Sequence, residues 1–294
     1  MELIRTYGNI IKKYAPDHPL AAFRMIKAGL ALEQFRSKHL AAKKLPGAYQ
    51  YLNTYAVGEV LEALKHPETS VWANIFAPVE LLQCFGLHSL SIECLSSFLS
   101  GFTIEDYFLD YAENEGLAST LCSYHKNFIG SIDSGIIPPA AFAVTTSTIC
   151  DGNINTFRHL SEKHQVPSFF IDVPQYDTHD AKEYVTEQLK ELIAMLEDTF
   201  HKKFQQKELV SILERENKSK ACYERCLKNL RTHHYPSTLT MQMYMLFASH
   251  MNIGTPEILH FYQQMEAETA AAPKFHGTNI LWVHLLPYYQ ETLK

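Results

Sequence analysis

The alternation of strand-like and helix-like segments between residues 70 and 174 constrains the fold more than any other feature of the sequence. Short apolar runs rich in β-branched and aromatic residues recur in this stretch, and amphipathic segments separate them. We expect strands at residues 70–76, 88–94, 140–146 and 168–174. Strands that alternate with helices form parallel sheets covered on both faces. The sequence therefore predicts an α/β protein with a doubly wound, flavodoxin-like or Rossmann-like parallel sheet.

Helical periodicity dominates on both sides of this stretch, and a further apolar run appears near the C-terminus. We expect an N-terminal helical region (1–66), an α/β domain (67–178), a helical linker region (179–272) and the first βα piece of a second α/β domain (273–294). The last piece consists of a strand at 278–284 and the start of a helix at 287–293. Because the sequence stops within that unit, we expect it to be the front part of a longer protein.

Charge and hydropathy exclude several classes of protein. The net charge of −6 argues against a nucleic-acid-binding surface, which needs a basic face. No apolar run approaches the roughly 18 residues that a membrane span requires, and the N-terminus lacks the basic-then-apolar order of a signal peptide. Six cysteines without regular close spacing do not resemble a secreted disulfide framework. We therefore expect a cytoplasmic protein with reduced or metal-bound thiols.

Two cysteines, Cys122 and Cys150, stand where a strand-like or loop segment gives way to a helix. A thiol at a helix start lies near the positive end of the helix dipole, which lowers its pKa and favours the thiolate that metals bind. The two positions are about one helix plus one strand apart, so one βα unit returns the chain to the same sheet edge. This spacing makes Cys122 and Cys150 candidate ligands of one metal centre.

The other cysteines and the histidines have simpler interpretations. Cys84 and Cys94 suit core packing, and Cys222 and Cys226 share one face of an ordinary amphipathic helix. The fifteen histidines form no zinc-site spacing, and we expect them to be ordinary residues. Asp151 is best explained as the N-cap of the helix that follows Cys150, and Pro78 is placed to open the helix after the first strand.

The sequence lacks the motifs of three familiar enzyme classes. A Rossmann dehydrogenase needs G-x-G-x-x-G after a strand, and a P-loop enzyme needs G-x-x-x-x-G-K-[ST]; neither pattern occurs. A hydrolase based on cysteine and histidine is conceivable, but no nucleophile-elbow pattern supports it. Any ATP hydrolysis therefore belongs to a partner.

Four motifs in order resemble the 2-hydroxyacyl-CoA dehydratase D-component family, which shares a superfamily with benzoyl-CoA reductase subunits. They are Ala77–Gly86, Cys122–Lys126, Cys150-Asp151 and Val166–Pro174, and the similarity covers roughly residues 66 to 294. The resemblance implies a [4Fe–4S] cluster held by three cysteines per subunit, with Cys122 and Cys150 at two of the three positions. The family's third cysteine lies in a second α/β domain, and no cysteine follows Cys226 in this sequence.

The resemblance also implies partners and a reaction. Family members act as two-subunit enzymes, and an ATP-dependent iron–sulfur activator injects one electron at low potential. An acyl-CoA substrate then loses its 2-hydroxyl group through a ketyl radical, and the electron is recycled. The implied role for this chain is that of an iron–sulfur-dependent hydro-lyase subunit.

Several assignments remain open at this stage. Glu80 is either a first-turn dipole partner or, as the resemblance implies, a carboxyl group near the substrate that moves a proton or hydroxyl. Ser123, Tyr124 and Lys126 are solvated helix residues or contacts to the cluster or to CoA phosphates. Two other functions fit the same superfamily: a reductase subunit of the benzoyl-CoA or double-cubane-cluster type, and a non-catalytic subunit that scaffolds a partner or relays electrons.

Overall fold

The computed structural model describes residues 2–40, 45–148 and 150–278. Two compact units make up the chain, one containing Met1–Gly29 and Val60–Gln205 and the other Leu30–Glu59 and the described residues from 206 onward. The strand expected at 278–284 lies almost entirely outside the described residues, and the helix expected at 287–293 lies wholly outside them. The boundaries of the four regions expected from the sequence remain a prediction.

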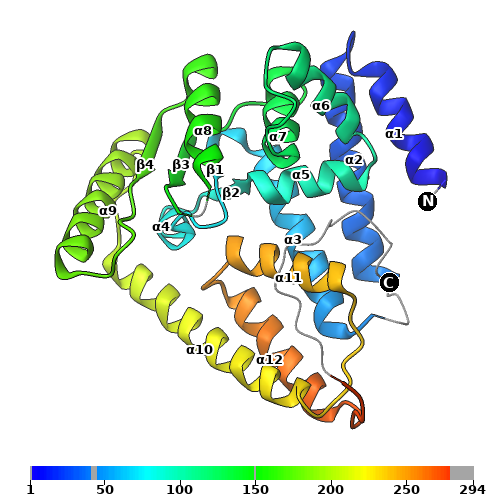
Figure 1. The fold of residues 1–294 in the computed structure, drawn as a ribbon, viewed down its shortest axis with the longest axis vertical. Helices are drawn as coiled ribbons and strands as arrows, with labels where there is room; N and C mark the ends of the chain where they lie inside the picture. The colour runs from blue at the N-terminus through cyan, green and yellow to red at the C-terminus, as the bar shows by residue number, and fades with distance from the viewer. Residues whose placement is uncertain (1, 41–44, 149, 279–294) are drawn as a thin grey trace. The chain divides into compact units, whose positions relative to one another are not determined.

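A four-stranded, all-parallel sheet forms the centre of the first unit. Its strands are β1 (Ser70–Ala73), β2 (His88–Ser91), β3 (Phe142–Thr146) and β4 (Ser168–Ile171), in the spatial order β2-β1-β3-β4 (Figure 1). In the register, Trp72 lies opposite Leu90 on one side and Ala143 on the other. This order is that of a flavodoxin-like sheet, so the predicted fold class is confirmed.

Helices cover both faces of this sheet. Right-handed crossovers place α4 (Val79–Cys84) on one face, and α5 (Ile92–Gly101), α7 (Ser123–Asp133) and α8 (Asp151–His164) on the other. The ring of Trp72 meets Phe128 of α7 edge-on at 6.1 Å, which fixes that face. On the opposite face, Phe142 lies 6.3 Å from Phe200 of α9 (His179–Phe200). Alternate strand residues therefore pack against different helix layers, as the period of a β-strand requires.

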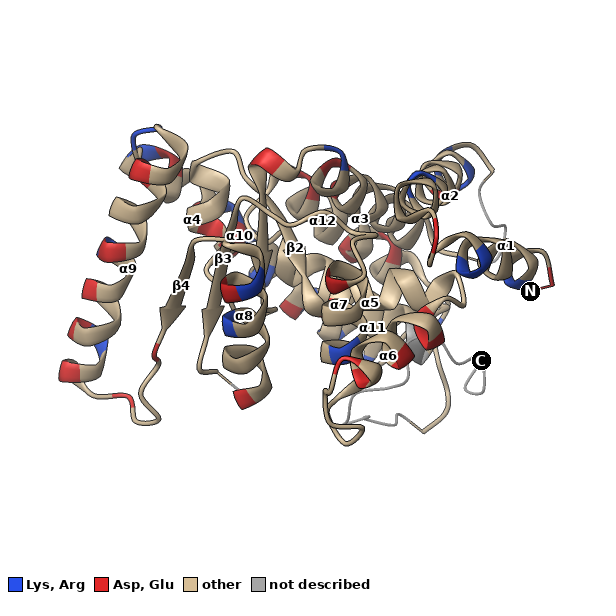
Figure 2. Cartoon of the chain, turned by 90° about the horizontal axis from the view of Figure 1, so that it is seen from above, with Lys and Arg blue, Asp and Glu red and all other residues tan. Residues whose placement is uncertain are grey.

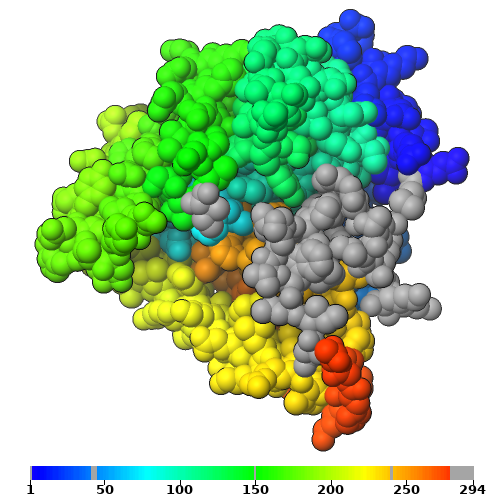
Figure 3. Space-filling model, viewed as in Figure 1, coloured from blue at the N-terminus to red at the C-terminus, as the bar shows by residue number. Residues whose placement is uncertain are grey.

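α7 and α8 lie side by side (Figure 1), and their green segments are neighbours on the face shown in Figure 3. Both helices contribute a buried aromatic ring to the core, Phe128 from α7 and Phe157 from α8, with the ring centres 6.4 Å apart. α6 (Glu105–Asn114) packs along α7. β1 is buried along its whole length, with Val71, Trp72 and Ala73 at 0% exposure. The sheet is therefore a rigid platform for the helix ends that surround it.

The N-terminal region is helical, as expected. It comprises α1 (Glu2–Tyr14), α2 (Pro19–His39) and α3 (Gly47–Lys65), followed by the short 3-10 turn Pro67–Thr69. Within the first unit, Lys12 of α1 forms an ion pair with Asp106 at 2.8 Å, and Tyr7 donates a hydrogen bond to the carbonyl oxygen of Met25. These contacts tie α1 to helices that come later in the chain.

The second unit contains α10 (Gln206–Leu230), α11 (Leu239–Met251) and α12 (Pro256–Ala271), and α10 packs on α12. The carboxylate of Glu268 accepts hydrogen bonds from the hydroxyl of Tyr235 at 2.6 Å and from the backbone N–H of Ala48, in the first turn of α3, at 3.1 Å. A negative charge there satisfies a free N–H group and complements the helix dipole. Cys222 and Cys226 are buried between α10 and α12, which agrees with the packing role expected for them.

Several local predictions were wrong. The strands expected at 70–76 and 168–174 each end three residues early, at Ala73 and Ile171. The strand expected at 88–94 ends at Ser91, because the Ser91 hydroxyl accepts a hydrogen bond from the backbone N–H of Cys94 and so caps α5. The helix α8 has Cys150 at its N-cap position, and Asp151 is its first helical residue. Asp151 is therefore a first-turn acidic residue and not the cap. Among the described residues, no helix is long and apolar enough to cross a membrane.

Candidate functional site

The carboxyl edge of the sheet gathers the helix N-termini of the first unit. β1 leads to α4, β2 to α5 and β3 to α8, while α7 runs down to β3 and so begins at this same edge. The strand order reverses between β1 and β3, since β2 and β4 lie on opposite sides of that pair. In open α/β sheets, ligands bind outside the carboxyl ends of the strands at such a switch point. This edge is therefore where a site is expected.

Cys122 and Cys150 both occupy N-cap positions at this edge. Cys122 precedes α7 and is exposed, and Cys150 precedes α8 and is partly buried. Neither side chain caps its own helix with a hydrogen bond. Both thiols are therefore available to a ligand, one on each of two adjacent helices.

A histidine that the sequence did not single out lies beside Cys150. The Nε2 atom of His125 is 3.6 Å from the Cys150 sulfur, and its Nδ1 atom is 2.8 Å from the Thr156 hydroxyl. His125 is buried, with 5% of its surface exposed, and this burial lowers the pKa of its imidazole. The His125 imidazole of α7 thus contacts Cys150 and Thr156 of the α8 segment through its two ring nitrogens, one helical turn after Cys122.

Gly152 makes the approach of His125 possible. A Cβ atom at this position would lie 3.0 Å from His125 Nε2 and 3.3 Å from the Cys150 sulfur. Both distances are tight for a carbon atom, so any side chain would press on the contact. The absence of a side chain at Gly152 is part of the geometry of the site.

Buried polar groups also lie at the carboxyl ends of β1 and β3. Asn74 is completely buried and donates a hydrogen bond from Nδ2 to the Thr146 hydroxyl at 3.2 Å. Within the described part of the chain, the Asn74 carbonyl oxygen Oδ1 has no hydrogen-bond partner. Buried acceptors of this kind are normally satisfied, so this edge has hydrogen-bonding capacity that the described residues do not use.

Besides Asp151 in the first turn of α8, two more carboxyl groups stand at the same edge. Glu80 lies in the first turn of α4, after β1, as the sequence predicted. Glu93, which the sequence analysis did not identify, lies in the first turn of α5, and its Oε2 atom is buried without a hydrogen-bond partner among the residues that the structure describes. Burial raises the pKa of Glu93 and outweighs hydrogen bonds from Ser91 and from the backbone of Ile75 and Glu93. Glu93 therefore keeps its proton to a higher pH than an exposed glutamate does.

Other residues near the thiols are engaged elsewhere. Lys126 is buried, and its ammonium group donates to the Glu113 carboxylate and to the carbonyl oxygen of Ser119. It is thus committed to α6 and the loop before α7, which weakens the suggestion that it reaches CoA phosphates. Burial raises the pKa of the Cys94 thiol to about 12, which suits the packing role expected for it.

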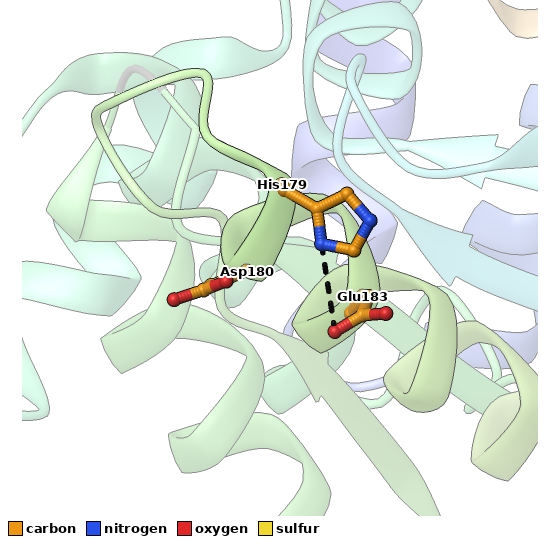
Figure 4. Close-up of side chains that lie close together, drawn as sticks. All are labelled: His179, Asp180 and Glu183. Atoms are coloured by element: carbon orange, nitrogen blue, oxygen red, sulfur yellow. Dashed lines mark ion pairs between the residues drawn. The ribbon is translucent and has the colours of Figure 1, made fainter.

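A second group of possible metal ligands, His179, Asp180 and Glu183, lies at the start of α9 (Figure 4). Acidic residues recur along this helix, as the red segments of Figure 2 show. All three side chains are exposed, and His179 Nδ1 is 3.7 Å from a carboxylate oxygen of Glu183. Exposed groups held only by the first turn of a helix are weakly oriented, so this arrangement has the character of a solvated surface pair.

The donor set at the switch point fits an iron–sulfur cluster in its chemistry. Cluster irons take thiolate ligands, and hydrogen bonds to the sulfurs tune the cluster. Two thiols begin adjacent helices here, and an imidazole already touches one of the sulfurs. Ligands of one cluster bind different irons, so they need not meet as closely as the ligands of a single ion.

The fold and this edge define a flavodoxin-like α/β protein with a pair of thiols at its ligand-binding switch point. The family model described as "2-hydroxyglutaryl-CoA dehydratase, D-component" matches residues 74–294, and the chain belongs to this family. No curated protein matches the chain. Membership makes the chain a component of the 2-hydroxyacyl-CoA dehydratase type, and such a dehydratase has a partner subunit.

Proposed function

We propose that this chain is the subunit of a 2-hydroxyacyl-CoA dehydratase that holds a [4Fe–4S] cluster through Cys122 and Cys150. The observation that carries the proposal is the placement of both thiols at the N-termini of α7 and α8, at the switch point of the sheet, within the region that matches the family model. Two thiolates leave the remaining irons in need of other ligands. Bound there, the cluster supplies one-electron chemistry and an iron with Lewis-acid character.

The proposed reaction removes water from a 2-hydroxyacyl-CoA after an ATP-dependent activator has delivered one electron, by way of a substrate ketyl radical. The tasks of the protein are to orient the thioester, to limit access of water and to manage the departing hydroxyl group. A hydroxyl leaves as water only if it receives a proton. Our candidates for this proton transfer are Glu80 and Glu93, which lie at the carboxyl edge, and Glu93 has the raised pKa that suits a proton donor.

Anaerobic reconstitution with iron, sulfide and 2-mercaptoethanol tests the cluster directly. The small thiol completes the coordination of each iron that lacks a protein ligand. We expect the wild-type chain to bind iron and sulfide in equal numbers and to give an EPR signal after reduction. Cys122→Ser and Cys150→Ser should each lose most of the bound iron.

Cys84→Ser is the matched control. The Cys84 sulfur donates a hydrogen bond to the carbonyl oxygen of Glu80 at 3.2 Å, and a serine hydroxyl keeps that donor. This variant should therefore bind as much iron as the wild type. Iron binding that survives both Cys122→Ser and Cys150→Ser would overturn the ligand assignment, and a wild-type chain without iron would overturn the cluster.

The type of reaction is tested with the partner subunit, the activator, ATP and a 2-hydroxyacyl-CoA. A dehydratase forms enoyl-CoA with catalytic amounts of reductant, because the electron is recycled. Consumption of reductant in proportion to product would instead indicate a reductase, and a rate independent of Cys122 and Cys150 would indicate a non-catalytic subunit.

A further inference from the structure

We propose that His125 is a positioning residue that donates its Nε2–H to the sulfur of Cys150 and thereby raises the reduction potential of the cluster. This inference rests on the proposed function, because it concerns the same site. It goes further by assigning a role to His125, Thr156 and Gly152. His125 lies within the motif Cys122–Lys126, but neither the family match nor the sequence analysis gave any of the three a role.

The partners of the imidazole determine which nitrogen carries the proton. A neutral imidazole has one N–H donor and one acceptor nitrogen. The Cys150 sulfur, as a thiolate ligand, can only accept, so Nε2 must be the donor in the contact measured at 3.6 Å. Nδ1 must then accept from the Thr156 hydroxyl, at 2.8 Å. The sulfur therefore fixes the tautomer, and Thr156 supports it because its hydroxyl can donate to Nδ1.

The surroundings hold the ring in this orientation. His125 lies in the first turn of α7, and Thr156 lies in α8 with 2% of its surface exposed. Gly152, also in α8, leaves room for Nε2 to reach the sulfur. A surface histidine that met the thiol by chance would have neither a buried partner for its second nitrogen nor a glycine on its path.

The expected effect follows from charge. Reduction adds a negative charge to the cluster and its sulfur ligands, and a hydrogen bond to a sulfur stabilises the more negative state. Removal of the N–H donor should therefore make the cluster harder to reduce. We expect a change of about tenfold in the ratio of reduced to oxidised cluster at a fixed potential, which is about 59 mV for a one-electron couple.

The experiment is an EPR-monitored redox titration of the reconstituted chain, with iron counted in each sample. His125→Leu removes the donor, whereas His125→Gln keeps an amide N–H near the position of Nε2. Thr156→Val preserves the shape of the side chain but removes the hydroxyl that donates to Nδ1 and holds the ring, and Thr156→Ser retains the hydroxyl. We expect a lower potential in the Leu and Val variants, and potentials closer to the wild type in the Gln and Ser variants, with iron content unchanged throughout.

The outcomes separate this inference from the proposed function. A cluster with the same potential in all four variants overturns the role of His125 and leaves the cluster in place. Loss of iron in His125→Gln would show that His125 is itself a metal ligand, which also overturns the inference. A wild-type chain that binds no iron overturns the proposed function and this role with it.

Discussion

The two ends of the α7–α8 helix pair contrast in how their polar groups are used. At the N-terminal end, which we call the sulfur end, lie Cys122, His125, Cys150, Gly152 and Thr156. At the C-terminal end, the carboxylate end, lie Asp133, His159, Lys163 and His164. Asp133 has 1% of its side chain exposed and accepts hydrogen bonds from His164 at 2.7 Å, His159 at 2.8 Å and Lys163 at 3.0 Å.

The difference assigns a stabilising role to one end of the helix pair and a ligand-binding role to the other. A buried carboxylate surrounded by three donors is fully satisfied, and such groups join helices. The sulfur end holds two thiols that cap nothing. We therefore expect substitutions at the carboxylate end to change stability, and substitutions at the sulfur end to change what the protein binds.

The largest effect on stability should come from Asp133→Asn. The substitution replaces a buried, charge-assisted acceptor with a neutral amide, and we expect a loss of about 2 kcal/mol in the free energy of unfolding. Denaturant unfolding monitored by circular dichroism measures this loss. Iron content after reconstitution should stay at the wild-type value, and a parallel loss of iron would remove the distinction between the two ends.

At low pH the wild type should no longer have a higher free energy of unfolding than Asp133→Asn. Burial alone would raise the pKa of Asp133, but hydrogen bonds from His159, His164 and Lys163 outweigh it, so the pKa lies below the ordinary value of 3.8. A carboxyl group with a lowered pKa contributes stability that is present above its unfolded-state pKa and is lost as the pH falls through its folded-state pKa.

Unfolding free energies of both proteins from about pH 6 to about pH 2 provide the measurement. The difference between them should be constant at the upper end and should shrink below the unfolded-state value. A difference that persists unchanged at the lowest pH would mean that the charge of Asp133 does not stabilise the helix pair.

A smaller change in stability is expected from Gly152→Ala at the sulfur end. Alanine favours the helix by up to about 1 kcal/mol over glycine, which offsets the crowding of His125 and Cys150 by the new Cβ. The free energy of unfolding should therefore change by less than about 1 kcal/mol. The reduction potential should nevertheless fall, as in His125→Leu, because the imidazole is pushed away from the sulfur. An unchanged potential would show that the site accommodates a methyl group.

The smallest effect should follow substitution of the exposed group on α9. His179→Ala and Glu183→Gln remove a contact between side chains that are 81% and 70% exposed. We expect each to change the free energy of unfolding by less than about 0.5 kcal/mol, with no change in bound iron. Either a larger loss or a change in metal content would show that this surface pair has a role that its exposure does not suggest.

Most of the fold could be predicted because each strand carries its own local signal. Buried parallel strands are continuous apolar runs, and the segments around Trp72 and Val144 are of this kind. The end of β2 was missed because Ile92, Cys94 and Leu95 prolong the apolar pattern into α5. The cap that ends the strand is a single hydroxyl, that of Ser91.

The site could be predicted only in part, for a different reason. Cys122 and Cys150 were recognisable because helix starts and family motifs mark them. His125 and Thr156 are 31 residues apart and meet only through the packing of α7 on α8. Glu93 was missed because it fell inside the strand expected at 88–94, and because its hydrogen bond from the backbone of Ile75, in the loop after β1, is not encoded near it. One signal was present: Cys122 and His125 are spaced to share a face of one helix turn.

Gly152 turns this geometry into a pattern that can be read from sequence alone. In a chain of this fold with Cys-x-x-His at the start of α7 and Cys before α8, we expect the second position after the later cysteine to face the imidazole, as Gly152 does here. A glycine there permits the approach of the ring to the sulfur, and a larger residue opposes it. Relatives that carry the histidine should keep the glycine, and relatives without the histidine are free to vary at both positions.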